Sequence, residues 1–193
     1  MSKYSKIVAT LGIVTGLGIA SLPLATFAAP LPLDGSIPTS QNVTVKLTVG
    51  DAVAVAVDNN NVNAGNTSPN QHRTATSTVS YATNHGTGMT LTVKDTDNNT
   101  SMTAGLSGTP VPGTNVIEAG TNGNVAGSGK WSIKGGLLTN PTAMVKSSET
   151  ALKIQESNSP VNADVNVTYD ISTGAAQLAG SYEDTIVYTA AVK

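Results

Sequence analysis

The chain has 193 residues, a formal net charge of −2 and no cysteine, and only 11% of its residues are charged. The lack of cysteine excludes disulfides, thiol catalysis and thiolate metal sites. Without an excess of basic residues, we also expect neither nucleic acid nor anionic lipid as a partner.

The first 28 residues have the pattern of a secretory signal peptide. A basic start at Lys3 and Lys6 is followed by an uncharged apolar stretch and then by the helix breaker Pro23. Small residues come next, so we expect export and cleavage after Ala28 or Ala29. A retained membrane anchor is the alternative, although the apolar run is shorter than the roughly 20 residues that a spanning helix needs.

Removal of this segment leaves about 164 residues, the size of one domain. Eight Lys and Arg then face twelve Asp and Glu, so the net charge is near −4. We expect an extracellular or cell-surface protein that has no membrane contact after cleavage, and a cysteine-free composition of this kind suits a Gram-positive-type envelope. Residues 29–41 are Pro-rich and predict an extended tether, and residues 42–193 predict the folded domain.

Apolar residues recur with a period of two along the domain, as in β-strands. In the run 53–57 both faces are apolar, so this strand is expected to be buried or protected at an edge. The link 84–88 supplies glycine for a turn, and residues 58–71 form a polar loop. Eight strand-like runs are expected at 43–49, 53–57, 77–83, 89–94, 130–134, 151–155, 165–171 and 185–192, with a short ninth candidate at 116–117.

Outside the signal peptide, the sequence contains no sustained helical period. Short strands separated by turn signals are typical of a sandwich of two sheets. The fold class predicted is therefore all-β, with a single β-sandwich of immunoglobulin-like or jelly-roll-like type after the signal peptide.

The histidines give little support for catalysis. His72 and His85 are the only two, and both lie in polar, turn-like stretches. A Ser–His–Asp site would need one of them buried beside a carboxylate, with a serine in a nucleophile-elbow context. Two separated histidines without cysteine also disfavour zinc. We expect no enzymatic activity and no cofactor.

Asp95, Asp97 and Asn99 alternate as oxygen ligands do at the start of a calcium loop. The pattern then departs from such a loop, because Thr100 stands where the sharp-turn glycine belongs and no bidentate Glu follows at the required position. A hairpin turn is the favoured interpretation, and a calcium site is the weaker alternative.

Trp131 is the only tryptophan, and it alternates with Ile133 in a short strand. A solvent-facing Trp131 near a tyrosine such as Tyr188 would offer an aromatic platform for stacking against a sugar ring. The competing interpretation, which we favour, places Trp131 in the core of the sandwich.

Two passages, residues 78–95 and 167–189, resemble secreted Gram-positive-type surface proteins. Their layout is similar to that of WxL cell-wall-binding domains, in which a Trp-x-Leu motif occurs near the middle and at the C-terminus. Trp131-Ser132-Ile133 approximates the middle copy, and Tyr188-Thr189-Ala190 stands where the terminal copy would be. The resemblance implies a location in the cell envelope and, more distantly, binding to cell-wall glycan.

Two functions follow as hypotheses. The first is a non-catalytic extracellular structural or adhesion protein of the cell surface, with a self-associating envelope or fibre subunit as one variant. In that variant the extended residues 30–40 would add as a strand to a neighbour's sheet edge. The second is a glycan- or cell-wall-binding module with Trp131 as its platform. The expected partners are envelope glycan, other surface proteins or a second copy of the chain.

Overall fold

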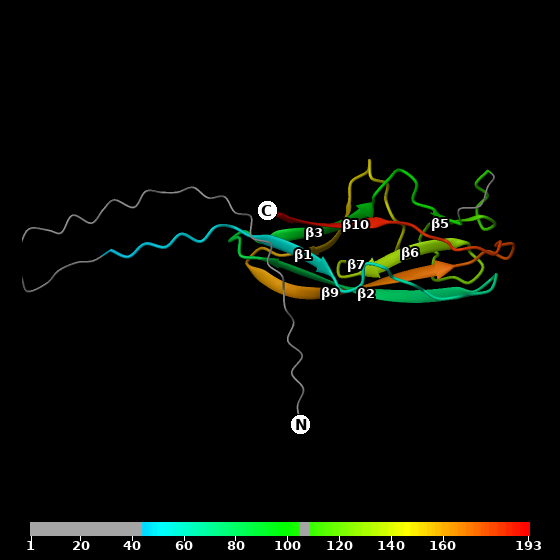
Figure 1. Ribbon diagram of the computed structural model, residues 1–193, viewed down its shortest axis with the longest axis horizontal. Coiled ribbons are helices and arrows are strands. Elements are labelled where there is room, and N and C mark those ends of the chain that lie inside the picture. The colour runs from blue at the N-terminus through cyan, green and yellow to red at the C-terminus, as the bar shows by residue number, and fades with distance from the viewer. Residues whose placement is uncertain (1–43, 105–108) are drawn as a thin grey trace, which may run out of the picture. The chain divides into compact units, whose positions relative to one another are not determined.

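The structure, a computed structural model, describes residues 44–104 and 109–193. The predicted signal peptide (1–28) and tether (29–41) lie outside the described residues. Residues from Leu47 to Lys193 form one compact unit, drawn in Figure 1. Its described part contains strands and no helix, so the all-β prediction is confirmed there. Nothing in that part is a helix long and apolar enough to cross a membrane.

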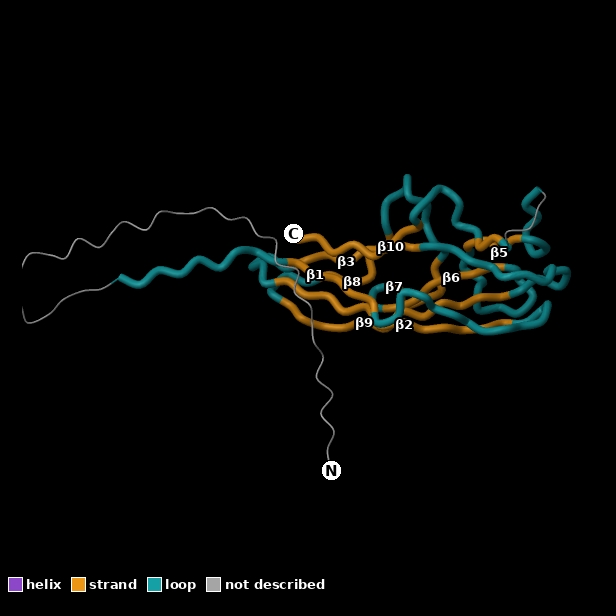
Figure 2. Tube along the Cα trace, in the orientation of Figure 1, coloured by secondary structure: helices purple, strands orange, loops and turns teal. Residues whose placement is uncertain are grey.

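The described residues contain ten strands, which make up two sheets (Figure 2). The larger sheet has seven strands in the order β1-β2-β9-β6-β5-β4, and β7 pairs with β6. The smaller sheet has the order β10-β3-β8. The strands are β1 (Val53–Val57), β2 (His72–Thr83), β3 (Met89–Asp95), β4 (Met102–Thr103), β5 (Val116–Ala119), β6 (Lys130–Gly135), β7 (Leu138–Thr142), β8 (Leu152–Glu156), β9 (Val161–Ser172) and β10 (Ile186–Val192).

Strands β2 and β9 form the long central pair of the larger sheet. They pair antiparallel from His72 opposite Ser172 to Thr83 opposite Val161. All neighbouring pairs are antiparallel except β5 and β6, which run parallel. This long central pair fixes which residues of the larger sheet face inward, since directly opposed residues lie on the same face.

Both sheets contribute to one hydrophobic core. Val79 and Val167 come from the larger sheet, and Leu91, Val93 and Ile154 come from the smaller one; all five are fully buried. The apolar residues that recur with a period of two are therefore buried together, because alternate residues of a strand lie on the same face of the sheet.

The link between β2 and β3 confirms the predicted glycine turn. Gly88 has a φ of +81°, and a Cβ atom there would lie 2.2 Å from the carbonyl oxygen of Ser157. Both the left-handed backbone and the close approach require glycine.

The structure differs from the sequence prediction at the first two runs. Described residues 44–50 belong to no strand, although 43–49 was expected to be one. The run 53–57 is a strand, but the expectation that it is buried or protected at an edge is wrong: Val53 and Val55 are 41% and 37% exposed. The physical reason is that β1 has a hydrogen-bonded neighbour, β2, on one side only. Strands β4 and β7 were not predicted; β7 lacks apolar alternation and contains Pro141.

Candidate functional site

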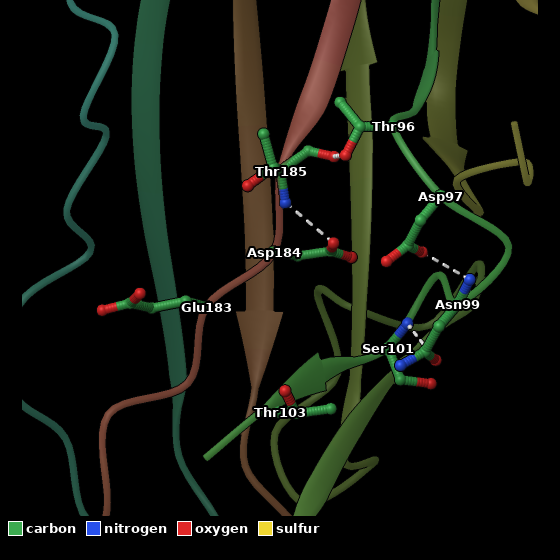
Figure 3. A pocket seen from close by; sticks show the side chains of 8 residues that line it. All are labelled: Thr96, Asp97, Asn99, Ser101, Thr103, Glu183, Asp184 and Thr185. Atoms are coloured by element: carbon green, nitrogen blue, oxygen red, sulfur yellow. Dashed lines mark hydrogen bonds between the residues drawn. The ribbon is translucent and has the colours of Figure 1, made fainter. Parts of the chain in front are cut away.

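A polar pocket of about 190 Å³ lies between the loop that follows β3 and the residues that precede β10 (Figure 3). Oxygen-bearing side chains dominate its lining. The lining residues are Thr96, Asp97, Asn99, Ser101, Thr103, Glu183, Asp184 and Thr185.

The loop after β3 is built from successive side-chain-to-backbone turns. Asp95 Oδ1 accepts a hydrogen bond from the Asp97 N–H at 2.9 Å, and Asp97 Oδ1 accepts one from the Asn99 N–H at 2.6 Å. Asn99 Oδ1 in turn accepts from the Ser101 N–H at 3.3 Å. These are the local bonds that make Asp and Asn favoured in turns. The loop is therefore built from turns, but it is not the predicted hairpin, because β3 and β4 belong to different sheets.

The pairing of β10 with β3 brings a distant carboxylate to this loop. The Thr96 N–H and hydroxyl both donate to the carbonyl oxygen of Thr185, each at 3.1 Å. Asp184 therefore lies opposite the start of the loop, and its Oδ1 accepts from the Thr185 N–H at 2.8 Å. Figure 3 shows the side chains of Asp97 and Asp184 pointing toward one another.

The carboxyl groups of Asp95 and Asp184 influence each other's pKa. Asp95 is 0% exposed, and its Oδ2 and that of Asp184 are buried without a hydrogen-bond partner. Burial, followed by repulsion from Asp95, raises the pKa of Asp184 to about 7. Burial likewise raises the pKa of Asp95, against the lowering effect of its bond from Asp97. Two carboxyl oxygens in this region are thus buried without a hydrogen-bond donor.

No basic side chain in residues 44–104 and 109–193 neutralises this group. Asp95, Asp97, Glu183 and Asp184 form no ion pair there with Lys, Arg or His. The nearby Lys94 donates its ammonium to the carbonyl oxygen of Ser147 instead. Within the same described ranges, no three His, Cys, Asp or Glu side chains are arranged as a ready-made metal cluster. The group offers a carboxylate pair with a third carboxylate nearby.

Of the three residues of the weaker calcium prediction, Asp97 and Asn99 line the pocket, whereas Asp95 is buried and is not among its lining residues. The structure adds Asp184, which the sequence analysis missed. Nothing around Asp184 in the sequence distinguishes it, because its partner lies 89 residues earlier and only strand pairing joins them.

The aromatic platform is not available at the surface. Trp131 is 1% exposed within the core, and its indole N–H donates to the carbonyl oxygen of Thr100 at 2.8 Å. Tyr188 is half-buried, and its hydroxyl lies 2.8 Å from that of Tyr169. A stacked sugar would need an exposed aromatic face, so these two side chains do not form the platform considered for them.

One histidine does lie beside a buried carboxylate, contrary to its expected turn-like setting. His72 begins β2, and its Nε2 lies 3.0 Å from Asp170 Oδ1. Thr74 Oγ1 lies 3.4 Å from the same nitrogen. In a catalytic triad the carboxylate and the nucleophile occupy opposite nitrogens of the imidazole, so this arrangement does not match a triad.

A second feature is the apolar segment before β1. Its alternating side chains lie in water: Val45, Leu47 and Val49 are 89%, 88% and 73% exposed. In the described chain, residues 44–50 have no sheet partner. Exposed apolar alternation of this kind is uncommon outside interaction surfaces.

Among the described residues, strand β1 lies at the edge of the larger sheet and has no neighbour beyond it. The carbonyl of Ala52 and the N–H of Asp58 bond toward β2. Bonded and non-bonded pairs alternate in an antiparallel ladder. Between Ala52 and Asp58, the main-chain N–H and C=O groups of successive residues therefore point alternately toward β2 and away from it. The groups that point away from β2 are those of Val53, Val55 and Val57.

Strand β10, which lies beside β1, ends the smaller sheet in the same way. The carbonyl of Thr185 and the N–H of Lys193 bond toward β3 and its preceding turn. By the same alternation, the main-chain N–H and C=O groups of the even-numbered residues of β10 point away from β3. These belong to Ile186, Tyr188, Ala190 and Val192. We call these four residues, with Val53, Val55 and Val57, the edge-strand surface.

The edge-strand surface is apolar and incompletely covered. Val57 pairs with the buried Val79, and Ala190 pairs with the buried Leu91, so both strands present these side chains on their inner faces. Val53 and Val192 nevertheless remain 41% and 45% exposed. In the described chain no backbone hydrogen bond joins β1 to β10.

No protein-family model matches the chain, and the comparison with curated proteins finds none significantly similar to it.

Proposed function

We propose that the protein is a non-catalytic structural subunit of the cell surface that associates with further copies of itself. The observation that carries this proposal is the exposed apolar segment 44–50, which alternates like a strand but has no sheet partner among the described residues. Burying Val45, Leu47 and Val49 would contribute about 1.5 to 3 kcal/mol per side chain. A partner that completes the strand would therefore be strongly favoured.

The edge-strand surface of another copy supplies such a partner. It combines free main-chain groups with exposed valines, and an added β-strand needs both. Addition of one chain's segment to the next chain's edge is a head-to-tail contact, which generates an open filament or a ring rather than a closed dimer. Residues 30–40, the donor considered from sequence, lie outside the described residues, and 44–50 takes that role in the proposal.

The location and the finer fold are part of the same proposal. The signal-peptide pattern of residues 1–28 and the hydroxyl-rich, weakly charged composition support an extracellular position. The single core shared by both sheets supports a β-sandwich of immunoglobulin-like or jelly-roll-like type. The WxL-like layout supports a location in the cell envelope but not glycan binding. Trp131 is buried, so it cannot serve as the aromatic platform for a sugar ring.

Electron microscopy and light scattering of the purified protein test this function. We expect filaments or rings whose formation depends on protein concentration. The double variant Leu47→Asp/Val49→Asp should remain monomeric, because a charge on the inserted face cannot be buried. Val125→Asp, at a 52% exposed loop position, is the matched control and should still assemble. A wild-type protein that stays monomeric at all concentrations contradicts the proposal.

A further inference from the structure

We propose that Asn84 is a positioning residue for self-association: its side chain ends the pairing of β1 with β2 and holds the C-terminal end of segment 44–50 ready for a second copy. This inference rests on the self-association proposed above, and it identifies what keeps the segment available to a partner. The hydrogen bonds at the junction between the segment and β1 carry it.

The junction lies where β2 ends. Val53 is the first residue of β1 to pair with β2, and it lies opposite Thr83, the last residue of β2. After Thr83 the chain turns through residues 84–88 into β3. The main-chain groups of Gly50 and Ala52 that point to the β2 side would therefore need a longer β2 to continue the ladder.

The side chain of Asn84 takes the place of that missing strand. Its Oδ1 accepts a hydrogen bond from the Ala52 N–H at 2.6 Å, and its Nδ2 donates to the carbonyl oxygen of Gly50 at 2.9 Å. The main-chain N–H of Asn84 also donates to the Ala52 carbonyl at 3.3 Å. One side-chain amide thus satisfies a main-chain donor and a main-chain acceptor, because it carries both functions.

The two neighbours of Asn84 hold the same junction. The Thr83 hydroxyl donates to the carbonyl oxygen of Ala52 at 2.8 Å, and His85 Nε2 lies 3.6 Å from Asp51 Oδ2. Three successive side chains of the turn therefore contact the three successive residues 50–52. A strand end that merely frays has few such bonds, so the ladder stops here at a defined point. In the described chain, residues 44–49 beyond it have no sheet partner.

This junction makes the segment a continuation of β1. Val49 precedes Val53 by four residues, and alternate residues of an extended chain share a face, so the apolar face of β1 continues into the segment. A segment whose position is fixed before binding loses less conformational entropy when it binds. We therefore expect Asn84 to act on the affinity between copies more than on the stability of one copy.

Asn84→Ala tests this inference by light scattering and urea denaturation. The protein concentration at which assembly begins should rise about tenfold, because two bonds that order the junction are lost. The urea midpoint of a single copy should change little, since water can replace both bonds at this exposed position. The monomeric double variant Leu47→Asp/Val49→Asp is the background for that second measurement.

Two further variants show which function of the amide matters. Asn84→Asp keeps an acceptor for the Ala52 N–H but has no donor for the Gly50 carbonyl, so it should also raise the assembly threshold. Asn162→Ala removes an exposed amide from β9 and is the matched control. It should leave both the assembly threshold and the urea midpoint unchanged.

Amide hydrogen exchange in the monomeric background measures the junction directly. The Ala52 N–H should be protected, and Asn84→Ala should remove this protection while the amides of β1 that bond to β2 keep theirs. A purely structural role of Asn84 would instead lower the urea midpoint and the protection of β1 as a whole, and that result overturns the inference.

The outcomes separate this inference from self-association. Equal assembly thresholds for the wild type and Asn84→Ala overturn the role of Asn84 and leave self-association standing. An Ala52 N–H that exchanges freely in the presence of Asn84 has the same consequence. A wild-type protein that never assembles overturns self-association and this inference together, whatever the Ala52 amide shows.

Discussion

The phenol groups of Tyr169 and Tyr188 meet between the two sheets, with their oxygen atoms 2.8 Å apart. Tyr169 lies on β9 of the larger sheet, and Tyr188 lies on β10 of the smaller one. The hydroxyl of Tyr169 is also 2.9 Å from Ser77 Oγ, so a chain of three hydroxyls crosses the interior. Burial and the neighbouring Tyr169 raise the pKa of Tyr188, which keeps the phenol of Tyr188 neutral.

Removal of one member of this chain should lower stability without disturbing the fold. Tyr188→Phe loses the bond between the sheets, and we expect the free energy of unfolding to fall by about 1 kcal/mol. Urea denaturation followed by circular dichroism measures the change. Tyr81→Phe, whose hydroxyl makes no hydrogen bond to the described residues, is the control and should change stability by less. Equal effects of the two variants would contradict a role for the hydroxyl chain.

Trp131→Phe should destabilise the protein by about 1 to 3 kcal/mol. The change leaves a cavity in the core and an unsatisfied carbonyl at Thr100. Urea denaturation measures the loss. A cell-wall sedimentation assay distinguishes this structural role from a binding platform. The folded variant should sediment with cell walls to the same extent as the wild type, and a loss of sedimentation at unchanged stability would restore the platform hypothesis.

The carboxyl group of Glu156 should titrate far below its usual range. Hydrogen bonds from the ammonium groups of Lys153 and Lys193 lower its pKa from 4.5 to about 2. Because the folded-state pKa is lowered, the ionised group stabilises the fold above pH 4.5. This contribution is lost as the pH falls toward 2.

An NMR titration of the Glu156 side chain provides the measurement. We expect a midpoint near 2 in the wild type, and a midpoint shifted back toward 4.5 in Lys153→Met. A midpoint near 4.5 in the wild type would show that solvent screens both pairs at this exposed position.

A mixing experiment tests the direction of the proposed association. Leu47→Asp/Val49→Asp disables the donor segment, and Val53→Lys/Val192→Lys places charges on the edge-strand surface. Each variant alone should remain monomeric. Mixed together they should form dimers and nothing longer, because one intact segment then meets one intact edge.

Size-exclusion chromatography with light scattering measures these species. Filaments formed by either variant alone would contradict the head-to-tail contact. Dimers formed by one variant alone would indicate an isologous interface instead.

The period of two was sufficient to find most strands, because it records which side chains leave water. Strands β2, β3, β6, β8, β9 and β10 all lie where alternation predicts them. Strand β7 was missed because Leu138–Thr142 carries Pro141 and pairs with β6 through a bulged register. Alternation also predicted a strand at 43–49. Apolar alternation indicates that a segment can pair as a β-strand, but it does not indicate whether a partner strand exists within the same chain.

The sequence by itself determined the all-β class, the turn at Gly88 and the turn-forming character of Asp95, Asp97 and Asn99. These are local properties, set by side-chain periodicity and by bonds between near neighbours. Only the tertiary structure decided that Asp184 lies beside the loop after β3, that Trp131 is buried, and that β1 and β10 are edge strands within the described residues. Each of these depends on which strands pair, and pairing is a long-range choice made by the whole core rather than by any one segment.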